Sequence, residues 1–281
     1  MNDYLLSLLL GLVEGLTEFL PVSSTAHLRI SEALLGVNLE DGYWKMFSIV
    51  IQLGAILCLP ILFWHRIAGF FQTFPGGKRG DRTALTHPLT LTLLAFVCTA
   101  GPSFLLKKVI GKNLENIVLM GVALVVGGVV MWIVDAVYAS RGVTKDVEDM
   151  SFGQAIWIGI CQILSAVIPG TSRSMVTIAA GQVSGLTRAA ALEFSFLLSI
   201  PTMAAATGYD LLKFLKPSHG DPPPHIDSHG WVVLAIGFMV SFLVAWGVVA
   251  WFMQWVRNRG FVPFAIYRII AGAAVIAWAI K

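Results

Sequence analysis

Six apolar stretches, each long enough to cross a lipid bilayer, limit what this chain can fold into. They lie at about residues 46–64, 88–106, 116–137, 189–210, 231–253 and 261–280. A spanning helix needs about 20 apolar residues, because the hydrocarbon core is about 30 Å thick and each helical residue rises about 1.5 Å. Only 12% of the residues are charged, against roughly 25% in soluble domains. The sequence therefore predicts an all-α integral membrane protein with about six transmembrane helices.

The N-terminal segment carries polar groups that anchoring in a membrane does not require. Residues 14–27 read EGLTEFLPVSSTAH. Glu14 and Glu18 are four residues apart, so on a helix their side chains lie on one face, one turn from each other. Pro21 then removes a backbone donor and disfavours helical geometry in the residue before it. We expect a helix that breaks near Pro21 with two acids close to the break.

A second short helix is expected directly after the break. His27 would lie in its first turn, where the amide donors and the positive end of the helix dipole favour an anion. Three hydroxyl residues precede or begin this helix as candidate caps: Ser23, Ser24 and Thr25. Broken helices at membrane depth are tolerated when they are buried in protein or line a cavity. We therefore predict a re-entrant helix pair with a polar tip.

The stretch at 152–186 repeats this pattern. At an offset of 148 residues, GLVEGLTEFLPVSS aligns without gaps over GICQILSAVIPGTS. In this alignment Pro21 matches Pro169, and Thr25 matches Arg173. Three predicted spans, an odd number, separate the copies, so two re-entrant pairs would enter from opposite faces of the membrane and meet near its middle. Transporters with inverted repeats place their sites at such an interface.

The organisation that follows is one membrane domain over residues 1–281. It consists of an inverted-topology repeat, with the first copy at about 1–138 and the second at about 150–281. Two re-entrant helix pairs complete the six spanning helices, and their tips form the mid-membrane site. The net charge of +3 is small and spread over many loops, so it gives no indication of nucleic acid binding.

Arg173 is the charge that the second tip adds to the site. An unpaired charge at the centre of a bilayer costs at least ~2.5 kcal/mol, so it has a partner or a function. A guanidinium clamps phosphate oxygens in a bidentate manner, and the segment PGTSRS adds hydroxyls and helix-start amides. The predicted phosphate-binding residues are Ser23, Thr25, Thr171, Ser172, Arg173, Ser174 and Thr177.

The two tips together resemble the undecaprenyl-pyrophosphate phosphatases of the bacitracin-resistance type. The resemblance rests on EGLTEFLPVSSTAH and PGTSRSMVT, and it extends over nearly the whole chain, including QLGA at 52–55 and FVPFAIYRI at 261–269. Ala26 departs from the family, where glycine is commoner. The resemblance implies an enzyme of the bacterial inner membrane that removes the terminal phosphate of a C55 isoprenoid pyrophosphate, with its site facing the periplasm. The motif residues carried over are Glu14, Glu18, Ser24, His27, Ser172, Arg173 and Thr177.

The resemblance also implies a divalent cation such as Mg²⁺ or Ca²⁺. Two carboxylates beside a pyrophosphate would repel it unless a cation lay between them, so Glu14 and Glu18 are the predicted metal ligands. Arg173 would neutralise the charge on the transferred phosphoryl group. Ser24 could act as a nucleophile with His27 as its base. Equally, His27 could activate water or protonate the leaving group, and one Glu could position His27.

Other interpretations stay open on the sequence alone. A lipid flippase or anion carrier would share the inverted repeat, but it has less need of paired acids together with Ser24 and His27. A protein that sequesters its lipid without hydrolysis is a third class. Glu193 and Arg268, each inside a predicted span, are expected to form a structural ion pair or to line the cavity. The lipid substrate and the bilayer are the expected partners, and a homodimer is compatible with the sequence.

Overall fold

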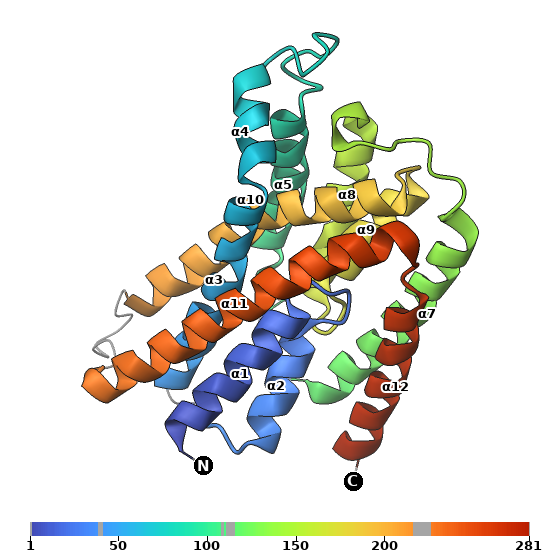
Figure 1. Ribbon diagram of the computed structural model, residues 1–281. Coiled ribbons are helices and arrows are strands. Elements are labelled where there is room, and N and C mark those ends of the chain that lie inside the picture. The colour runs from blue at the N-terminus through green and yellow to red at the C-terminus, as the bar shows by residue number, and fades with distance from the viewer. Residues whose placement is uncertain (1, 39–41, 108–109, 111–115, 216–225, 281) are drawn as a thin grey trace.

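The computed structural model describes residues 2–38, 42–107, 110, 116–215 and 226–280 (Figure 1). Six helices in these ranges are long and apolar enough to cross a membrane, as predicted. They are α3 (Gly42–Leu62), α5 (Pro88–Leu105), α7 (Ile117–Tyr138), α10 (Arg188–Leu215), α11 (Ser228–Asn258) and α12 (Val262–Ala279). Every α-helical or 3₁₀ element that remains in the described part is shorter. The chain is therefore an all-helical, multi-pass membrane protein.

The shorter helices include the two pairs that the sequence predicts. The first pair is α1 (Asp3–Thr17) with α2 (Ser24–Leu34), and the second is α8 (Phe152–Val167) with α9 (Arg173–Val183). In Figure 1, α1 begins at the lower end of the view beside the N-terminus, whereas α8 begins at the upper end. Entry from opposite faces of a membrane stays a prediction. Two further short elements are α4 (Trp64–Thr73) and the 3₁₀ turn η1 (Val147–Asp149).

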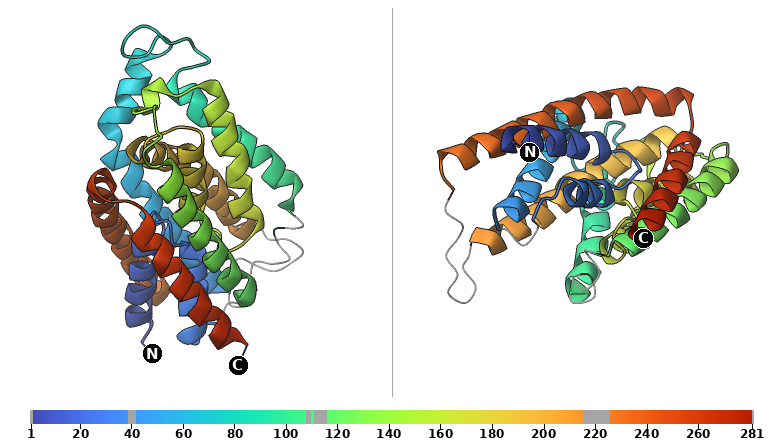
Figure 2. Two further views of the ribbon diagram at one scale, coloured as in Figure 1. Left: turned by 90° about the vertical axis from the view of Figure 1, so that its right-hand side faces the viewer. Right: turned by 90° about the horizontal axis from the view of Figure 1, so that it is seen from below.

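Each broken pair packs on a spanning helix from the other half of the chain. α1 lies along α11, and α8 lies along α5. Glycine permits both contacts, because a Cβ at Gly11 would lie 2.8 Å from the carbonyl oxygen of Gly237, and a Cβ at Gly159 would collide with the carbonyl oxygen of Ala95. α7 and α12 pack closely in the same manner across the halves. Figure 2 shows α1 beside α11 and α12 beside α7 toward the outside of the bundle.

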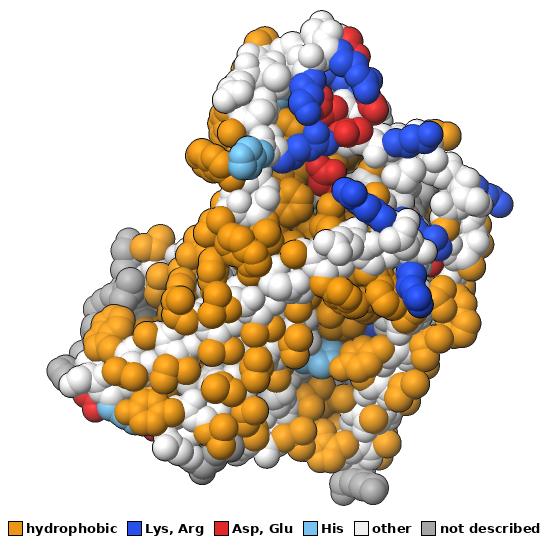
Figure 3. All heavy atoms as spheres, viewed as in Figure 1, with side chains coloured by type: hydrophobic (Ala, Val, Ile, Leu, Met, Phe, Trp, Pro, Cys, Tyr) orange, Lys and Arg blue, Asp and Glu red, His pale blue; other side chains and the backbone are white. Residues whose placement is uncertain are grey.

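Charged side chains gather at one end of the molecule, whereas hydrophobic side chains cover most of the rest of the face in Figure 3. At the charged end Arg66 of α4 forms ion pairs with Asp146, Glu148 and Glu193. The loop after α4 joins this cluster through Arg79, which lies 3.1 Å from Asp149. Glu193 therefore pairs with Arg66, so the first of the two alternatives for Glu193 and Arg268, an ion pair between them, is wrong.

Candidate active site

The second helix of each pair starts in the same manner. Ser23 caps α2 by accepting a hydrogen bond from the amide of Ala26, and Ser172 caps α9 by accepting one from the amide of Met175. Both serines have positive φ angles, 73° and 71°, which residues with a Cβ adopt rarely. Both helices contain 11 residues. The two tips are therefore structural copies of each other.

The structure corrects the alignment of the two tips by one residue. In the first tip, one residue, Val22, separates Pro21 from Ser23, the cap of α2. In the second tip, two residues, Gly170 and Thr171, separate Pro169 from Ser172, the cap of α9. Gly170 has φ of +88°, and a Cβ there would lie 2.7 Å from the carbonyl oxygen of Met120, so the longer turn requires glycine. Beyond this turn Arg173 is equivalent to Ser24. The predicted match of Arg173 with Thr25 is wrong.

Glu18 joins the two tips. The hydroxyl of Ser24 donates to its Oε2 at 2.5 Å, and Nη2 of Arg173 donates to its Oε1 at 3.1 Å. The equivalent first residues of α2 and α9 thus bind the two oxygens of one carboxylate, which is 5% exposed. A buried carboxylate is tolerated when charged and polar partners surround it in this way.

Two other groups at the same place have unused hydrogen-bonding capacity. Glu14 is 1% exposed, and its Oε1 has no hydrogen-bond partner among the described residues. Nε and Nη1 of Arg173 are also buried and without partners in the described ranges. Buried polar atoms are rarely left unpaired in proteins, and such atoms point to a missing ligand, ion or water. The site thus offers both a free cationic edge and a free carboxylate oxygen.

His27 lies next to this site, and its hydrogen bonds among the described residues do not involve Glu14 or Glu18. Its Nδ1 lies 2.8 Å from the carbonyl oxygen of Ser23, and its Nε2 lies 2.7 Å from the hydroxyl of Tyr267. A carbonyl only accepts, so Nδ1 carries the proton and Nε2 accepts from Tyr267 when the ring is neutral. The rings of His27 and Tyr267 also stack. Ser24, which bonds to Glu18, is not paired with His27.

The remaining predicted phosphate ligands have other contacts. Ser174 donates to the carbonyl oxygen of Leu20 at 2.9 Å, which ties the second tip to the first. Thr177 bonds within α9 and lies 2.7 Å from the hydroxyl of Ser195. Thr25 is exposed, and Thr171 is partly buried. Of the predicted phosphate-binding residues, Arg173 is the one that combines burial with unpaired donors in the described structure.

Arg268 of α12 is the residue whose role the sequence did not reveal. It is fully buried, and Nη1 donates to the carbonyl oxygen of Pro21 at 3.0 Å. Its Nη2 lies 3.0 to 3.2 Å from three further carbonyl oxygens, those of Ala123, Gly170 and Thr171. One guanidinium therefore bonds to the turns of both tips. An arginine inside a predicted span indicated a structural or functional role. The partners of Arg268 are backbone carbonyl oxygens, however, and a pattern of side chains in the sequence does not identify these.

Comparison with known proteins places the chain in a family. A family model described as bacitracin resistance protein BacA matches residues 7–274. A protein of Koribacter versatilis named undecaprenyl-diphosphatase is 69% identical over the full length of both chains. Proteins of the same name from Thermus thermophilus and Rhizobium etli are 42% and 39% identical, and each alignment covers at least 95% of both chains. The chain belongs to the BacA family of bacitracin resistance proteins.

Proposed function

We propose that this protein is an undecaprenyl-diphosphatase, which hydrolyses the C55 isoprenoid pyrophosphate to the lipid monophosphate and inorganic phosphate. The observation that carries the proposal is the contact of Glu18 with both Ser24 and Arg173, beside two guanidinium nitrogens that have no partner in the described structure. The names of the relatives support hydrolysis of a lipid pyrophosphate. They do not favour the flippase alternative.

Arg173 would bind the terminal phosphate through its unpaired nitrogens. Phosphoryl transfer depends chiefly on neutralising the equatorial oxygens and holding the attacking and leaving oxygens in line. The low-dielectric surroundings of the buried guanidinium strengthen that interaction. The bound phosphate would replace the missing hydrogen-bond partners of Nε and Nη1. Substrate binding thus satisfies groups that are unpaired in its absence.

Ser24 would attack the terminal phosphorus atom, and Glu18 rather than His27 would accept its proton. Its hydroxyl already donates to Oε2 of Glu18, which is the geometry of a nucleophile paired with a general base. The bond from Oγ to phosphorus would form as the bridging bond breaks, and the lipid monophosphate would leave. Water would then hydrolyse the phosphoserine, release inorganic phosphate and restore the hydroxyl.

We also propose that Glu14 and Glu18 hold a divalent cation, Mg²⁺ or Ca²⁺, when the pyrophosphate is bound. The donor set fits, since Mg²⁺ is commonly held by one or two carboxylates together with phosphate oxygens and water. The unpaired Oε1 of Glu14 is available for it. No group of three or more acids, histidines or cysteines that could hold a metal occurs among the described residues, so phosphate oxygens would complete the shell. The cation would neutralise charge on the pyrophosphate.

The location of the protein follows from the same proposal. We place it in the inner membrane of a bacterium with the charged end of Figure 3 in the cytoplasm, because Lys and Arg are enriched in cytoplasmic loops. Lys78, Arg79 and Arg82 in the loop between α4 and α5 support this orientation. The site would then open to the periplasm. A homodimer remains compatible with this placement.

The function is tested by measuring phosphate release from a C55 pyrophosphate with detergent-purified protein. We expect release that requires a divalent cation, is lost with EDTA and returns when Mg²⁺ or Ca²⁺ is added. Well-folded protein that releases no phosphate with the cation present would contradict the proposed phosphatase activity. Release that is insensitive to EDTA would contradict the proposed role of the divalent cation, but it would agree with hydrolysis of the pyrophosphate.

A further inference from the structure

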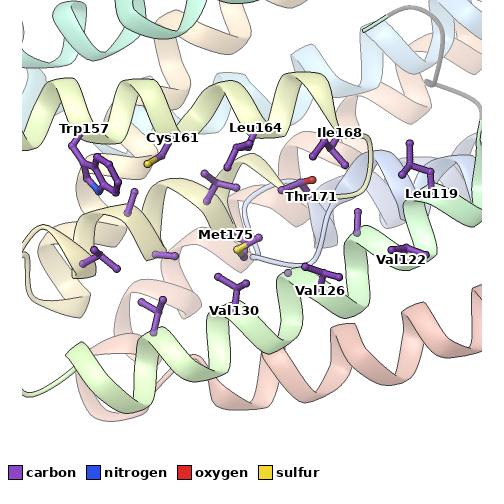
Figure 4. A pocket seen from close by; sticks show the side chains of 17 residues that line it. Leu119, Val122, Val126, Val130, Trp157, Cys161, Leu164, Ile168, Thr171 and Met175 are labelled. Carbon is purple, nitrogen blue, oxygen red and sulfur yellow. The ribbon is translucent and has the colours of Figure 1, made fainter. Parts of the chain in front are cut away.

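The second tip borders an apolar groove of about 440 Å³ between α7, α8 and α9. Figure 4 shows its lining, which includes Val126 and Met175, and none of the described residues that line it is charged. A phosphate ion would lose its hydration in this groove without gaining a charged partner, which is unfavourable. Inorganic phosphate formed at Arg173 would therefore leave on another side of the site, where polar and charged groups replace its water.

Arg29 lies on α2, the second helix of the first tip, five residues beyond Ser24. This spacing corresponds to about 7.5 Å along the helix axis. The side chain of Arg29 is 27% exposed. Thr25, four residues before it and therefore on the same side of α2, is also exposed. In Figure 1, α2 runs from the middle of the bundle toward the lower end, where the site would open. Arg29 therefore lies between Ser24 and the proposed opening.

Two side chains hold Arg29 in place. Its Nη1 donates to Oε2 of Glu32 at 3.1 Å, and the hydroxyl of Ser48 on α3 donates to Oε1 of Glu32 at 2.7 Å. Glu32 is fully buried, and both of its oxygens are thus paired. Nε and Nη2 of Arg29 have no hydrogen-bond partner among the described residues. These two nitrogens form one edge of the guanidinium, which can bind a phosphate group in a bidentate manner.

Stability does not explain this arrangement. A partly exposed ion pair contributes little, and apolar residues in place of a buried pair are often as stable or more stable. The carboxylates of Glu14 and Glu32 also lie close enough to interact electrostatically, so together with Glu18 they would repel a phosphate. Arg29 neutralises Glu32 and places positive charge on the exposed side of α2, where it would attract an anion.

We propose that Arg29, held by Glu32 and Ser48, is an outer phosphate-binding residue of the site. The inference rests on the proposed function. Its ligand is a phosphate group between Ser24 and the opening, which is bound through Nε and Nη2. Such a group has two sources, the inorganic phosphate that leaves and the lipid pyrophosphate that arrives. Arg29 would bind phosphate on its way to or from Arg173, and it would take no part in the transfer itself.

The test removes the guanidinium without leaving a buried acid unpaired. The double variant Arg29→Gln with Glu32→Gln does this, whereas the single change Arg29→Gln would leave Glu32 without its cation. Arg29→Lys keeps the charge and loses the edge formed by Nε and Nη2. Lys45→Gln is the control, because Lys45 is exposed and lies on α3 about one turn before Ser48. It removes one positive charge near the pair and leaves the pair intact.

Two quantities are measured with a C55 pyrophosphate labelled at the terminal phosphate. They are KM for the lipid and the concentration of unlabelled inorganic phosphate that halves the release of label. Thermal unfolding checks that each variant is folded. We expect at least one of the two quantities to rise about tenfold in the double variant, as for the loss of a charge-assisted contact. We expect kcat to stay within about twofold, because the contact is the same in ground and transition states.

The two quantities distinguish the source of the phosphate. A rise in the inhibitory phosphate concentration alone assigns Arg29 to the leaving phosphate, and a rise in KM alone assigns it to the lipid pyrophosphate. A rise in both assigns it to phosphate from either source. Arg29→Lys should show a smaller change in the same quantity than the double variant, and Lys45→Gln should behave as wild type.

Three results would overturn the role of Arg29 while leaving the function intact. The first is a double variant with wild-type values of both quantities. The second is an equal rise in Lys45→Gln, which would indicate a general attraction by positive charge. The third is a fall in kcat and in thermal stability with both quantities unchanged, which would assign the pair a structural role. Wild-type protein that releases no phosphate would instead remove the proposed function, and this inference with it.

Discussion

Glu18 is the residue on which the site depends, because it is the acceptor for a hydroxyl from one tip and a guanidinium from the other. The sequence predicted that the acids, Ser24 and Arg173 would meet, since the motifs and the internal repeat both indicated it. It could not predict that Ser24 pairs with Glu18 while His27 pairs with Tyr267. That choice depends on the direction of each side chain at the start of α2, which motif spacing does not determine.

Ser24→Ala tests the covalent route at this scale. We expect turnover to fall by at least ~10³-fold, because removing a nucleophile removes the step that the rest of the site supports. Acid quenching with terminally labelled pyrophosphate should trap labelled wild-type protein and leave the variant unlabelled. Ser199→Ala is the control, since Ser199 is buried and its hydroxyl bonds to the carbonyl oxygen of Ser195, with no hydrogen bond to Glu18 in the described structure.

Near-normal turnover by Ser24→Ala would exclude the serine and assign the attack to water. Loss of turnover with an unlabelled wild-type protein would also contradict a phosphoserine. In that case Ser24 would act by holding Glu18, and the labelled phosphate would pass directly to solvent.

At the scale of elements, the relation between the two tips was only partly predictable. The two broken helix pairs and their prolines were evident in the repeat, but a gapless alignment matched Arg173 with Thr25 instead of Ser24. Ser23 and Ser24 are both good caps, so the sequence does not reveal which of them begins the helix. Gly170 permits the longer turn because of its positive φ, and a single inserted residue at a turn does not change the apolar pattern around it.

Arg268 fixes the two turns relative to each other, and Gly127 provides the space for it. A Cβ at Gly127 would collide with Nη2 of Arg268 and lie 2.8 Å from Cε of Met175. Gly127→Ala should therefore displace the guanidinium from its carbonyl partners while leaving the charge in place. We expect kcat for phosphate release from the C55 pyrophosphate to fall at least tenfold, because a small misplacement of reacting groups is costly.

Gly121→Ala is the matched control for this prediction. Gly121 also lies on α7 against α12, where a Cβ would lie 2.7 Å from Cγ1 of Ile276, so both variants should lose roughly 1–3 kcal/mol of stability from overpacking. Thermal unfolding measures that loss. If both variants lose stability equally and also lose kcat equally, Arg268 has a structural role alone. A fall in kcat confined to Gly127→Ala supports positioning of the tips.

At the scale of the whole molecule, the two halves of the chain are interlocked. Composition and the lengths of the apolar stretches were sufficient to predict six spanning helices, because the bilayer requires long apolar segments. The contacts of α1 with α11 and of α8 with α5 could not be predicted. They depend on glycines at the contact, and a glycine in the sequence does not by itself indicate a close helix contact. The consequence for function is that neither half contains a complete site. Glu18 comes from one half and Arg173 from the other.

The most direct test of this account is a double-mutant cycle on kcat/KM for phosphate release, with Glu18→Gln, Arg173→Lys and the double variant, each checked for folding by thermal unfolding. Because the two side chains share one bond, their losses should not add. We predict that the double variant is within about twofold of the slower single variant. A double variant as slow as the product of the two single losses would contradict a site shared by both halves.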